Sequence, residues 1–173
     1  MVTVWHSANR YNHPMLFAVI TISDRCSQGL MTDTAGPAVA ALLLQNFPNV
    51  DLRTALVADD EDAIVSQLNQ VIHEGARLVL TAGGTGLGPR DRTPEATRRV
   101  IDREAPGLAE AMRFNGASQN KFSWLSRGVA GLKGSTLIVN LPGSKRGAEE
   151  SLTTILPLLK HGIEVAAGGQ THP

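Results

Sequence analysis

A glycine-rich segment with a carboxylate just beyond it has the residue types and the spacing for chemistry. Residues 81–97 read TAGGTGLGPRDRTPEAT, in which four glycines fall between positions 83 and 88. Glycine permits positive φ and lets the backbone come close to a ligand, most often a phosphate. A carboxylate repels phosphate, yet Asp91 follows the last glycine by three residues. A metal ion bridging the two groups would reconcile them.

Polar residues also follow three other apolar runs of the chain. The four segments of this kind are Ser23-Asp24-Arg25, Asp59-Asp60, Gly83 to Asp91 and Pro142-Gly143-Ser144. In open α/β sheets, ligands bind beyond the carboxyl ends of the strands. We therefore expect the four segments to meet at one edge of a sheet. Backbone N–H groups and the hydroxyls of Thr85 and Ser144 can hold an anion there.

The glycines do not match the common nucleotide-binding fingerprints. A P-loop requires Lys followed by Ser or Thr after its last glycine, but Gly88 is followed by Pro89 and Arg90. GTGLGP also lacks the G-x-G-x-x-G spacing of a dinucleotide site. A tight turn between a strand and a helix is the alternative role for this loop. Arg90, Asp91 and the other polar strand ends favour binding.

Asp59 and Asp91 are the carboxylates that we predict to work together. If they face each other across a cleft, they form a site for Mg²⁺, which proteins bind through one or two carboxylates plus substrate phosphates. The alternatives are structural. Asp59 or the adjacent Asp60 can cap the helix that follows, and one of the two is expected to do so. Asp91 can pair with Arg90 or Arg92 on a solvated loop.

The segments that carry these loops alternate between strand and helix patterns. Apolar runs rich in β-branched residues predict strands at 16–22, 50–57 and 77–81, and helical patterns lie between them. Two further β-like runs around Lys133-Gly134 are typical of a hairpin. The alternation predicts one α/β domain with a mostly parallel sheet, helices on both faces and an antiparallel hairpin.

The sequence also predicts the boundaries of two helices and the surroundings of one aromatic residue. Thr93 is expected to cap the helix after the glycine loop, with Pro94 at its first position. The last helix is expected to begin at about Gly147 and to kink or restart near Pro157. Trp124 could stack on a heterocycle, but it is expected to pack in apolar surroundings.

The composition excludes several classes of function. The 173 residues contain 16 basic and 16 acidic side chains, so no net field attracts nucleic acid or anionic membrane. One cysteine excludes an internal disulfide and every multi-cysteine metal site, as in a reduced cytoplasmic protein. No apolar run approaches the roughly 20 residues of a membrane span. Residues 1–15 are expected to form a polar leader, 16–165 the domain and 166–173 a flexible tail.

Five motifs together resemble the molybdenum-cofactor biosynthesis family that includes MogA, MoaB and the G domain of gephyrin. They are ISDR (22–25), TAGGTG (81–86), RDRTPEAT (90–97), LSR (125–127) and LIVNLPGS (137–144), in the order and spacing of the family. The resemblance implies a three-layer α/β fold and a homotrimer. It implies a molybdopterin adenylyltransferase, which adenylylates the terminal phosphate of molybdopterin with ATP and Mg²⁺ and releases pyrophosphate. The product passes to a molybdenum insertase of the MoeA type.

The resemblance also assigns roles to residues of this chain. The essential aspartates of the family fall on Asp59 and Asp91, with Asp60 as an adjacent rival for the first. The substrate-binding residues are expected at two strand ends and the two glycine turns: Ser23, Asp24, Gly83, Gly84, Thr85, Gly86, Pro142, Gly143 and Ser144. The chain departs from the family at three positions: Gly116 stands where many members have serine, Arg92 where valine is common, and Arg146, beside Lys145, where a lysine is usual.

Two other functions remain open at this point. One is a molybdopterin-binding or hand-over protein of the MoaB type without catalysis, and the presence of both Asp59 and Asp91 argues against it. The other is a nucleotide-processing enzyme of the competence-damage type, which has a similar glycine loop. The ISDR and LPGS motifs favour adenylylation over this second alternative.

Overall fold

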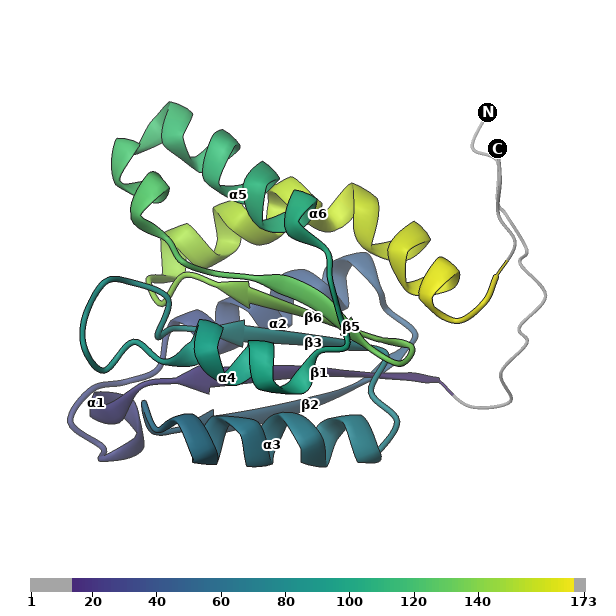
Figure 1. Cartoon of the computed structure of the whole chain (residues 1–173), viewed down its shortest axis with the longest axis horizontal. Coiled ribbons are helices and arrows are strands. Elements are labelled where there is room, and N and C mark those ends of the chain that lie inside the picture. The colour runs from purple at the N-terminus through teal and green to yellow at the C-terminus, as the bar shows by residue number, and fades with distance from the viewer. Residues whose placement is uncertain (1–13, 170–173) are drawn as a thin grey trace.

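Six strands in one sheet carry the loops described above. The computed structural model describes residues 14–169 of the chain (Figure 1). The strands are β1 (Met15–Ile22), β2 (Val50–Val57), β3 (Leu78–Ala82), β4 (Arg103–Glu104), β5 (Ala130–Lys133) and β6 (Thr136–Leu141). Their order across the sheet is β2-β1-β3-β6-β5-β4, in which β2, β1, β3 and β6 are parallel and β5 is antiparallel to both of its neighbours, β6 and β4. The predicted mostly parallel sheet and its antiparallel β5–β6 hairpin are confirmed.

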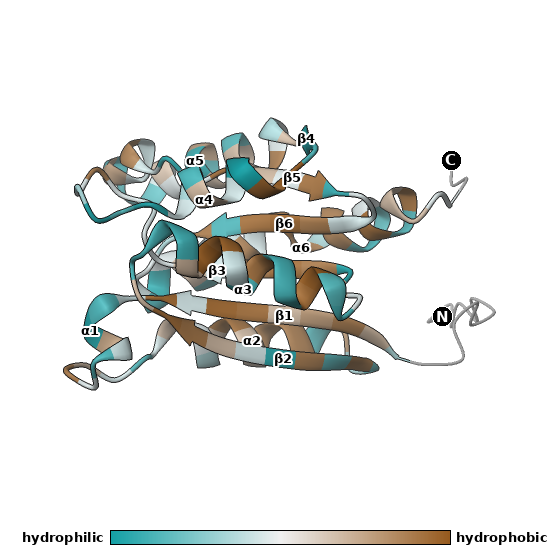
Figure 2. Cartoon of the chain, turned by 60° about the horizontal axis from the view of Figure 1, so that its bottom comes forward, coloured by the Kyte–Doolittle hydropathy of each residue, from teal (hydrophilic) through white to brown (hydrophobic). Residues whose placement is uncertain are grey.

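Helices cover both faces of this sheet. They are α1 (Asp24–Ser27), α2 (Ala35–Asn46), α3 (Glu61–His73), α4 (Thr93–Val100), α5 (Pro106–Gln119) and α6 (Lys145–Ala166), with the 3₁₀ helix η1 (Lys121–Leu125) after α5. Helices α2, α5 and α6 pack on one face and α3 and α4 on the other (Figures 1 and 2). The three-layer arrangement is therefore confirmed.

The two hydrophobic clusters follow from the alternation of side chains along the strands. Phe17 and Val19 of β1 face the α2–α5–α6 layer, whereas Ala18 and Ile20 face the α3–α4 layer. All residues of β3 and β6 are buried, as expected for strands covered on both faces. These strands are among the apolar segments in Figure 2. Burying one large aliphatic side chain contributes about 1.5–3 kcal/mol, so the layers are held mainly by this packing.

The pairing register brings four strand ends level at one edge. Ile22 of β1 pairs with Val57 of β2, and Ala82 of β3 pairs with both Thr21 and Leu141. These residues are the last or next to last of their strands. The four arrows end together at the left of Figure 1, next to α1. The loops that follow these strands must therefore begin side by side.

One predicted helix boundary is wrong, and the predicted start of the last helix lies two residues from the observed one. Thr93 is the first residue of α4 and does not cap it; Arg92 holds the cap position without a side-chain bond. Helix α6 begins at Lys145 because Ser144 caps it by accepting a hydrogen bond from Gly147 N, and it continues through Pro157 without a restart. Proline removes one backbone N–H from this 22-residue helix. Buried Ile155 and Leu159 on either side of Pro157 keep the helix against the sheet.

Trp124 is also not in the apolar surroundings expected for it. Its side chain, on η1, is 57% exposed and contacts the ring of Phe114 edge to face, with centroids 6.5 Å apart. Within residues 14–169, no helix is long and apolar enough to cross a membrane. Most of the expected leader, residues 1–13, and residues 170–173 of the expected tail lie outside the described residues.

Candidate active site

A cavity of about 700 Å³ lies where the four parallel strands end. The loops after β1, β2, β3 and β6 all contribute to its wall. Of the predicted site residues, those that line it are Ser23, Asp24, Asp59, Gly83, Gly84, Asp91, Gly143 and Ser144. The remaining three do not. Thr85 is buried, Gly86 lies next to Asp91, and Pro142 lines a separate cavity of about 40 Å³ beside α5.

The start of the glycine loop requires glycine for two reasons. Gly83 and Gly84 have φ of 116° and 62°, in the region that side chains rarely adopt. A Cβ on Gly83 would overlap the carbonyl oxygen of Ile22, and one on Gly84 would overlap Oγ1 of Thr93. Gly84 also faces Asp59, whose Oδ1 would lie 3.1 Å from that Cβ. The tight turn and the close approach to the cavity therefore come from the same residues.

Thr93 holds this turn from the other side. Its hydroxyl donates to Gly83 O at 2.8 Å, and its backbone N donates to Gly84 O at 3.1 Å. The Thr93 side chain is completely buried. A hydroxyl used in this way is not available to cap α4, which explains why the predicted cap is absent.

Asp59 and Asp60 have different environments although they are adjacent. Asp60 Oδ1 accepts a hydrogen bond from Ala63 N at 2.9 Å and caps α3, and Asp60 is not among the residues that line the cavity. Asp59 lines the cavity and exchanges hydrogen bonds with Asp24. One aspartate of the pair was expected to be a cap, and the structure assigns that role to Asp60.

The electrostatic surroundings of Asp59 disfavour its charged form. Burial raises the pKa of Asp59 above its ordinary value, and the negative charges of Asp24 and Asp91 act in the same direction. The hydrogen bond from Asp24 N and the charge of Arg90 oppose the rise without cancelling it. A carboxyl group whose pKa is raised next to other carboxylates is a candidate for cation binding, because a cation relieves their repulsion.

Asp91 lies inside its own loop. Its Oδ2 accepts a hydrogen bond from Gly88 N at 2.8 Å. Cβ atoms on Gly86 and Gly88 would lie 2.9 and 2.8 Å from this oxygen, so both glycines leave room for the carboxylate. Asp91 lines the same cavity as Asp59 and contributes to the raised pKa of Asp59. The two carboxylates that were predicted from the sequence to work together therefore line the same cavity.

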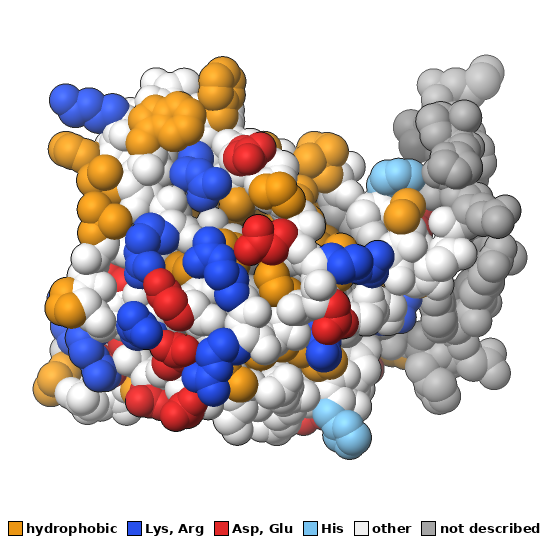
Figure 3. Space-filling model, in the orientation of Figure 1, with side chains coloured by type: hydrophobic (Ala, Val, Ile, Leu, Met, Phe, Trp, Pro, Cys, Tyr) orange, Lys and Arg blue, Asp and Glu red, His pale blue; other side chains and the backbone are white. Residues whose placement is uncertain are grey.

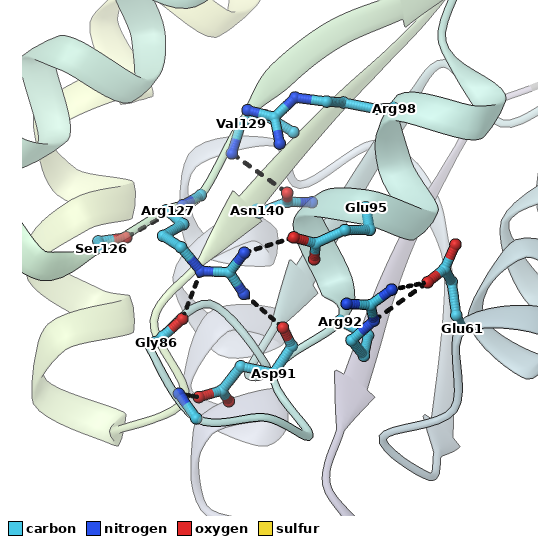
Figure 4. A network of polar contacts seen from close by, with 12 residues as sticks. Glu61, Gly86, Asp91, Arg92, Glu95, Arg98, Ser126, Arg127, Val129 and Asn140 are labelled. Carbon is cyan, nitrogen blue, oxygen red and sulfur yellow. Dashed lines mark hydrogen bonds and ion pairs between the residues drawn. The ribbon is translucent and has the colours of Figure 1, made fainter.

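The arginines of this loop bind carboxylates other than Asp91. Arg90 forms a two-pronged ion pair with Asp24, with both hydrogen bonds at 3.0 Å. Arg92 binds Glu61 on α3 at 2.7 Å (Figure 4). The alternative in which Asp91 pairs with Arg90 or Arg92 is not observed. On the face shown in Figure 3, Lys and Arg side chains are interspersed with Asp and Glu.

Two basic residues at the start of α6 differ in their position relative to the cavity. Lys145 lines the cavity, whereas Arg146 points elsewhere and pairs with Glu150 at 2.6 Å. The basic side chain beside the cavity is therefore that of Lys145, one residue before the position at which the family usually has a lysine.

Two residues that contact the walls of the site were not named as site residues from the sequence. Asp33, in the loop after α1, accepts a hydrogen bond from Thr21 Oγ1 at 2.6 Å and caps α2 through the backbone N atoms of Ala35 and Gly36. Arg127 reaches the glycine loop from the segment before β5 (Figure 4). The LSR motif contains Arg127, but only the fold shows which atoms it contacts.

A mostly parallel α/β sheet with a glycine turn and two carboxylates at its carboxyl edge is an arrangement typical of domains that bind phosphate-bearing ligands. The model of the family described as "Probable molybdopterin binding domain" matches residues 18–161, and the chain belongs to this family. The resemblance inferred from the five motifs is confirmed.

Three relatives illustrate the match. The chain is 41% identical over 150 residues to the molybdenum cofactor synthesis protein cinnamon of Drosophila melanogaster, covering 86% of this chain and 25% of that protein. It is 35% identical over 152 residues to a molybdopterin adenylyltransferase of Helicobacter pylori, covering 87% and 86%. The crystal structure of the molybdopterin biosynthesis enzyme MoaB from Thermus thermophilus superimposes with a TM-score of 0.82 at 46% identity, covering 89% and 97%.

The relatives differ in length. This chain spans between 22% and 47% of the length of three of the curated relatives that it matches, and 86% of the Helicobacter pylori enzyme. The shared part is in each case about 150 residues. The comparison therefore concerns this domain alone.

Proposed function

We propose that this protein transfers AMP from ATP to the terminal phosphate of molybdopterin in a Mg²⁺-dependent reaction that releases pyrophosphate. The observation that carries the proposal is the presence of Asp59 and Asp91 in one cavity with the glycine turn. A relative of nearly the same length is named for this activity. Transfer of this kind requires mainly positioning and charge stabilisation, which such a cavity can supply.

The N-terminus of α6 is the part of the cavity best suited to phosphate. Gly143, Ser144 and Lys145 line the wall there, at the positive end of a 22-residue helix. Backbone N–H groups, the helix dipole and the lysine all favour an anion. The N-terminus of α2 also borders the cavity, but the Asp33 carboxylate already occupies its N–H groups. We therefore place substrate phosphate at α6.

Asp59 and Asp91 are the residues that would hold Mg²⁺. Within residues 14–169, no group of three or more His, Cys, Asp or Glu side chains is arranged to hold a metal ion. Two carboxylates fit a metal that also takes ligands from substrate phosphates, as Mg²⁺ does. When bound, Mg²⁺ neutralises the charge that develops on the departing pyrophosphate. Because the pKa of Asp59 is raised, a proton competes with the cation for this carboxylate.

The residues of the chain would bring the two substrates together. The glycine turn and the α6 N-terminus hold phosphate groups through backbone N–H donors, so that an oxygen of the pterin phosphate faces the α-phosphorus of ATP. The phosphate oxygen forms the new P–O bond while the bond to pyrophosphate breaks on the opposite side. Holding the two groups in this geometry removes the entropic cost of their encounter.

The biological setting follows from the family resemblance. We propose that the protein acts in the cytoplasm as a homotrimer and passes adenylyl-molybdopterin to a molybdenum insertase. These proposals rest on the membership of the chain in the molybdopterin-binding family and are tested separately from the reaction.

The test is a turnover assay with purified protein, ATP, Mg²⁺ and molybdopterin that measures pyrophosphate and adenylyl-molybdopterin. Adenylylation predicts that both products appear in equal amounts and only when molybdopterin is present. Tight binding of molybdopterin without pyrophosphate would identify a hand-over protein. Cleavage of a nucleotide without molybdopterin would identify a nucleotide-processing enzyme. Either of these results contradicts the proposal.

A further inference from the structure

Arg127 connects the segment before β5 to the loop that carries Asp91. Its Nε donates to Gly86 O at 2.6 Å, and its two terminal nitrogens bond to Asp91 O and to the carboxylate of Glu95 (Figure 4). Its backbone N donates to Thr85 O at 2.9 Å. One residue therefore holds the loop before the exposed tip, after the tip, and at the first turn of α4.

The loop has few other links to the rest of the fold. The hydrogen bonds of Gly88 N to Asp91 Oδ2 and of Asp91 N to Gly88 O are both internal. Leu87 at the tip is exposed. In the part of the chain that the structure describes, two other side chains of this loop are bonded outside it: Arg90 pairs with Asp24 and Arg92 with Glu61, and the two arginines are 65% and 47% exposed. An exposed ion pair of this kind is weak, so Arg127 is the main restraint on the loop.

Glu95 keeps Arg127 in place. The two side chains are partly shielded from solvent, with exposures of 33% for Arg127 and 28% for Glu95. Burial alone would raise the pKa of Glu95, but the hydrogen bond and charge of Arg127 outweigh it and lower that pKa. Glu95 is therefore ionised at neutral pH. Its charge fixes one edge of the guanidinium while the other donors face the two loop carbonyls.

The arrangement requires arginine in particular. The planar guanidinium directs its donors at three acceptors in different directions, two carbonyls and one carboxylate. The ammonium of lysine has its three donors on one atom and cannot reach the same three acceptors across this span. A lysine at position 127 would keep the positive charge but would not hold the loop in the same way.

We propose that Arg127 is a positioning residue that fixes the backbone of Gly86 and Asp91 and thereby aims the Asp91 carboxylate into the cavity. The proposal rests on the proposed function for its effect on turnover, but its structural part is independent of it. Displacement of a reacting or ligating group by about 1 Å can cost on the order of 100-fold in rate. The effect should fall on turnover and on the requirement for Mg²⁺, because Asp91 is placed with the metal rather than with the pterin.

The test compares Arg127→Lys, Glu95→Gln and the control Arg98→Lys. Arg98 lies on α4, pairs with exposed Glu104 and does not contact the loop. Hydrogen exchange of the ligand-free proteins, read on peptides that cover residues 85–92, reports the loop itself. We expect Arg127→Lys to accelerate exchange in these peptides, Glu95→Gln to do so less because the two carbonyl contacts remain, and Arg98→Lys to match the parent.

The kinetic arm separates positioning from a general loss of structure. For Arg127→Lys we expect kcat to fall roughly 10- to 100-fold, the Mg²⁺ concentration for half-maximal rate to rise several-fold, and the KM for molybdopterin to change less than threefold. Unchanged exchange at residues 85–92 overturns the restraint, whether or not the parent is active. Faster exchange with an unchanged kcat and an unchanged Mg²⁺ requirement would show that the restraint by Arg127 does not affect turnover, and would overturn the catalytic part of the proposal. An inactive parent contradicts the proposed function and leaves the exchange result to decide the role of Arg127.

Discussion

Asp24 and Asp59 exchange hydrogen bonds between backbone and side chain. Asp24 N donates to Asp59 Oδ2 at 2.7 Å, and Asp59 N donates to Asp24 Oδ1 at 3.0 Å. The exchange ties the loop after β1 to the loop after β2, so the two strand ends form one rigid wall of the cavity. Arg90 uses both carboxylate oxygens of Asp24. Asp59 Oδ1 faces the glycine turn.

Asp91→Asn should abolish turnover and leave the fold intact. The amide keeps an oxygen that can accept from Gly88 N, but it lacks the charge that a metal needs. We expect a loss of at least about 100-fold in kcat, since groups that stabilise transition-state charge typically contribute this much. The melting temperature should change by less than about 2 °C, as for most surface substitutions. Pyrophosphate release and thermal unfolding measure the two effects.

Asp60→Asn is the matched control for that variant. It removes a charge next to Asp59, but asparagine caps helices as well as aspartate does, and Asp60 does not line the cavity. Activity and stability should both stay close to those of the parent. A larger loss of turnover in Asp60→Asn than in Asp59→Asn would show that the pair has been assigned in the wrong order.

Gly84→Ala should destabilise the protein more than Gly134→Ala does. Both glycines have positive φ, 62° and 56°, but the new Cβ overlaps Thr93 Oγ1 at position 84 and meets nothing within 4 Å at position 134. The cost of φ alone is about 1–2 kcal/mol, and Gly84→Ala should exceed it and also weaken molybdopterin binding. Urea unfolding and binding titrations measure this. Equal destabilisation of the two variants would mean that the turn relaxes around the added carbon.

Asp59→Asn should stabilise the ligand-free protein at neutral pH. Because the pKa of Asp59 is raised in the folded state, the folded state binds its proton more tightly than the unfolded state does. This contribution to stability is fully present below the ordinary pKa of 3.8 and is lost as the pH rises through the folded-state pKa. The variant should therefore gain stability relative to the parent between pH 4 and pH 7.5. Urea unfolding at both pH values tests this; a constant difference would exclude a raised pKa.

Lys145→Ala should weaken binding of phosphate-bearing ligands, whereas Arg146→Ala should not. Lys145 lines the cavity at the N-terminus of α6, and Arg146 is paired with Glu150. A hydrogen bond to a charged group is worth about 1.5–3 kcal/mol, so we expect the Kd for molybdopterin or ATP to rise at least tenfold in Lys145→Ala. Calorimetric titration distinguishes the two variants. The reverse order of effects would place the phosphate outside the α6 N-terminus.

The purified protein should have the mass of three chains in solution. The expectation comes from the family to which the chain belongs. Light scattering coupled to size exclusion measures the mass directly, over a tenfold range of protein concentration. A monomer at every concentration would contradict the proposed trimer and would leave the reaction to be tested independently.

Local patterns were sufficient for the main strands and helices of the fold, but not for α1, β4 and η1. Continuous apolar β-branched runs, such as residues 16–22, indicated strands covered on both faces, because only such strands lack polar positions. The boundaries were less predictable where a side chain binds outside its own segment. Thr93 has the residue type of a cap, but its hydroxyl is bonded to Gly83 O, ten residues earlier.

The carboxylates of the candidate site could be named from the sequence, but their division of labour could not. The residue types at the strand ends led to Asp59 and Asp91 because the carboxyl ends of parallel strands meet at one edge. Whether Asp59 or Asp60 caps α3 depends on backbone geometry at the helix start, which adjacent identical residues do not reveal. The same holds for Lys145 and Arg146 at α6.

The sequence by itself determined the order of the main strands and helices, the glycine turn and the candidate residues for phosphate and cation binding. These depend on side-chain type and on spacing within about 20 residues. Only the tertiary structure decided the contacts of Arg127, which lies 41 positions from Gly86 and 32 from Glu95. Such contacts arise from the packing of the η1–β5 segment against α4 and the glycine loop. No pattern along the chain records which distant atoms that packing brings together.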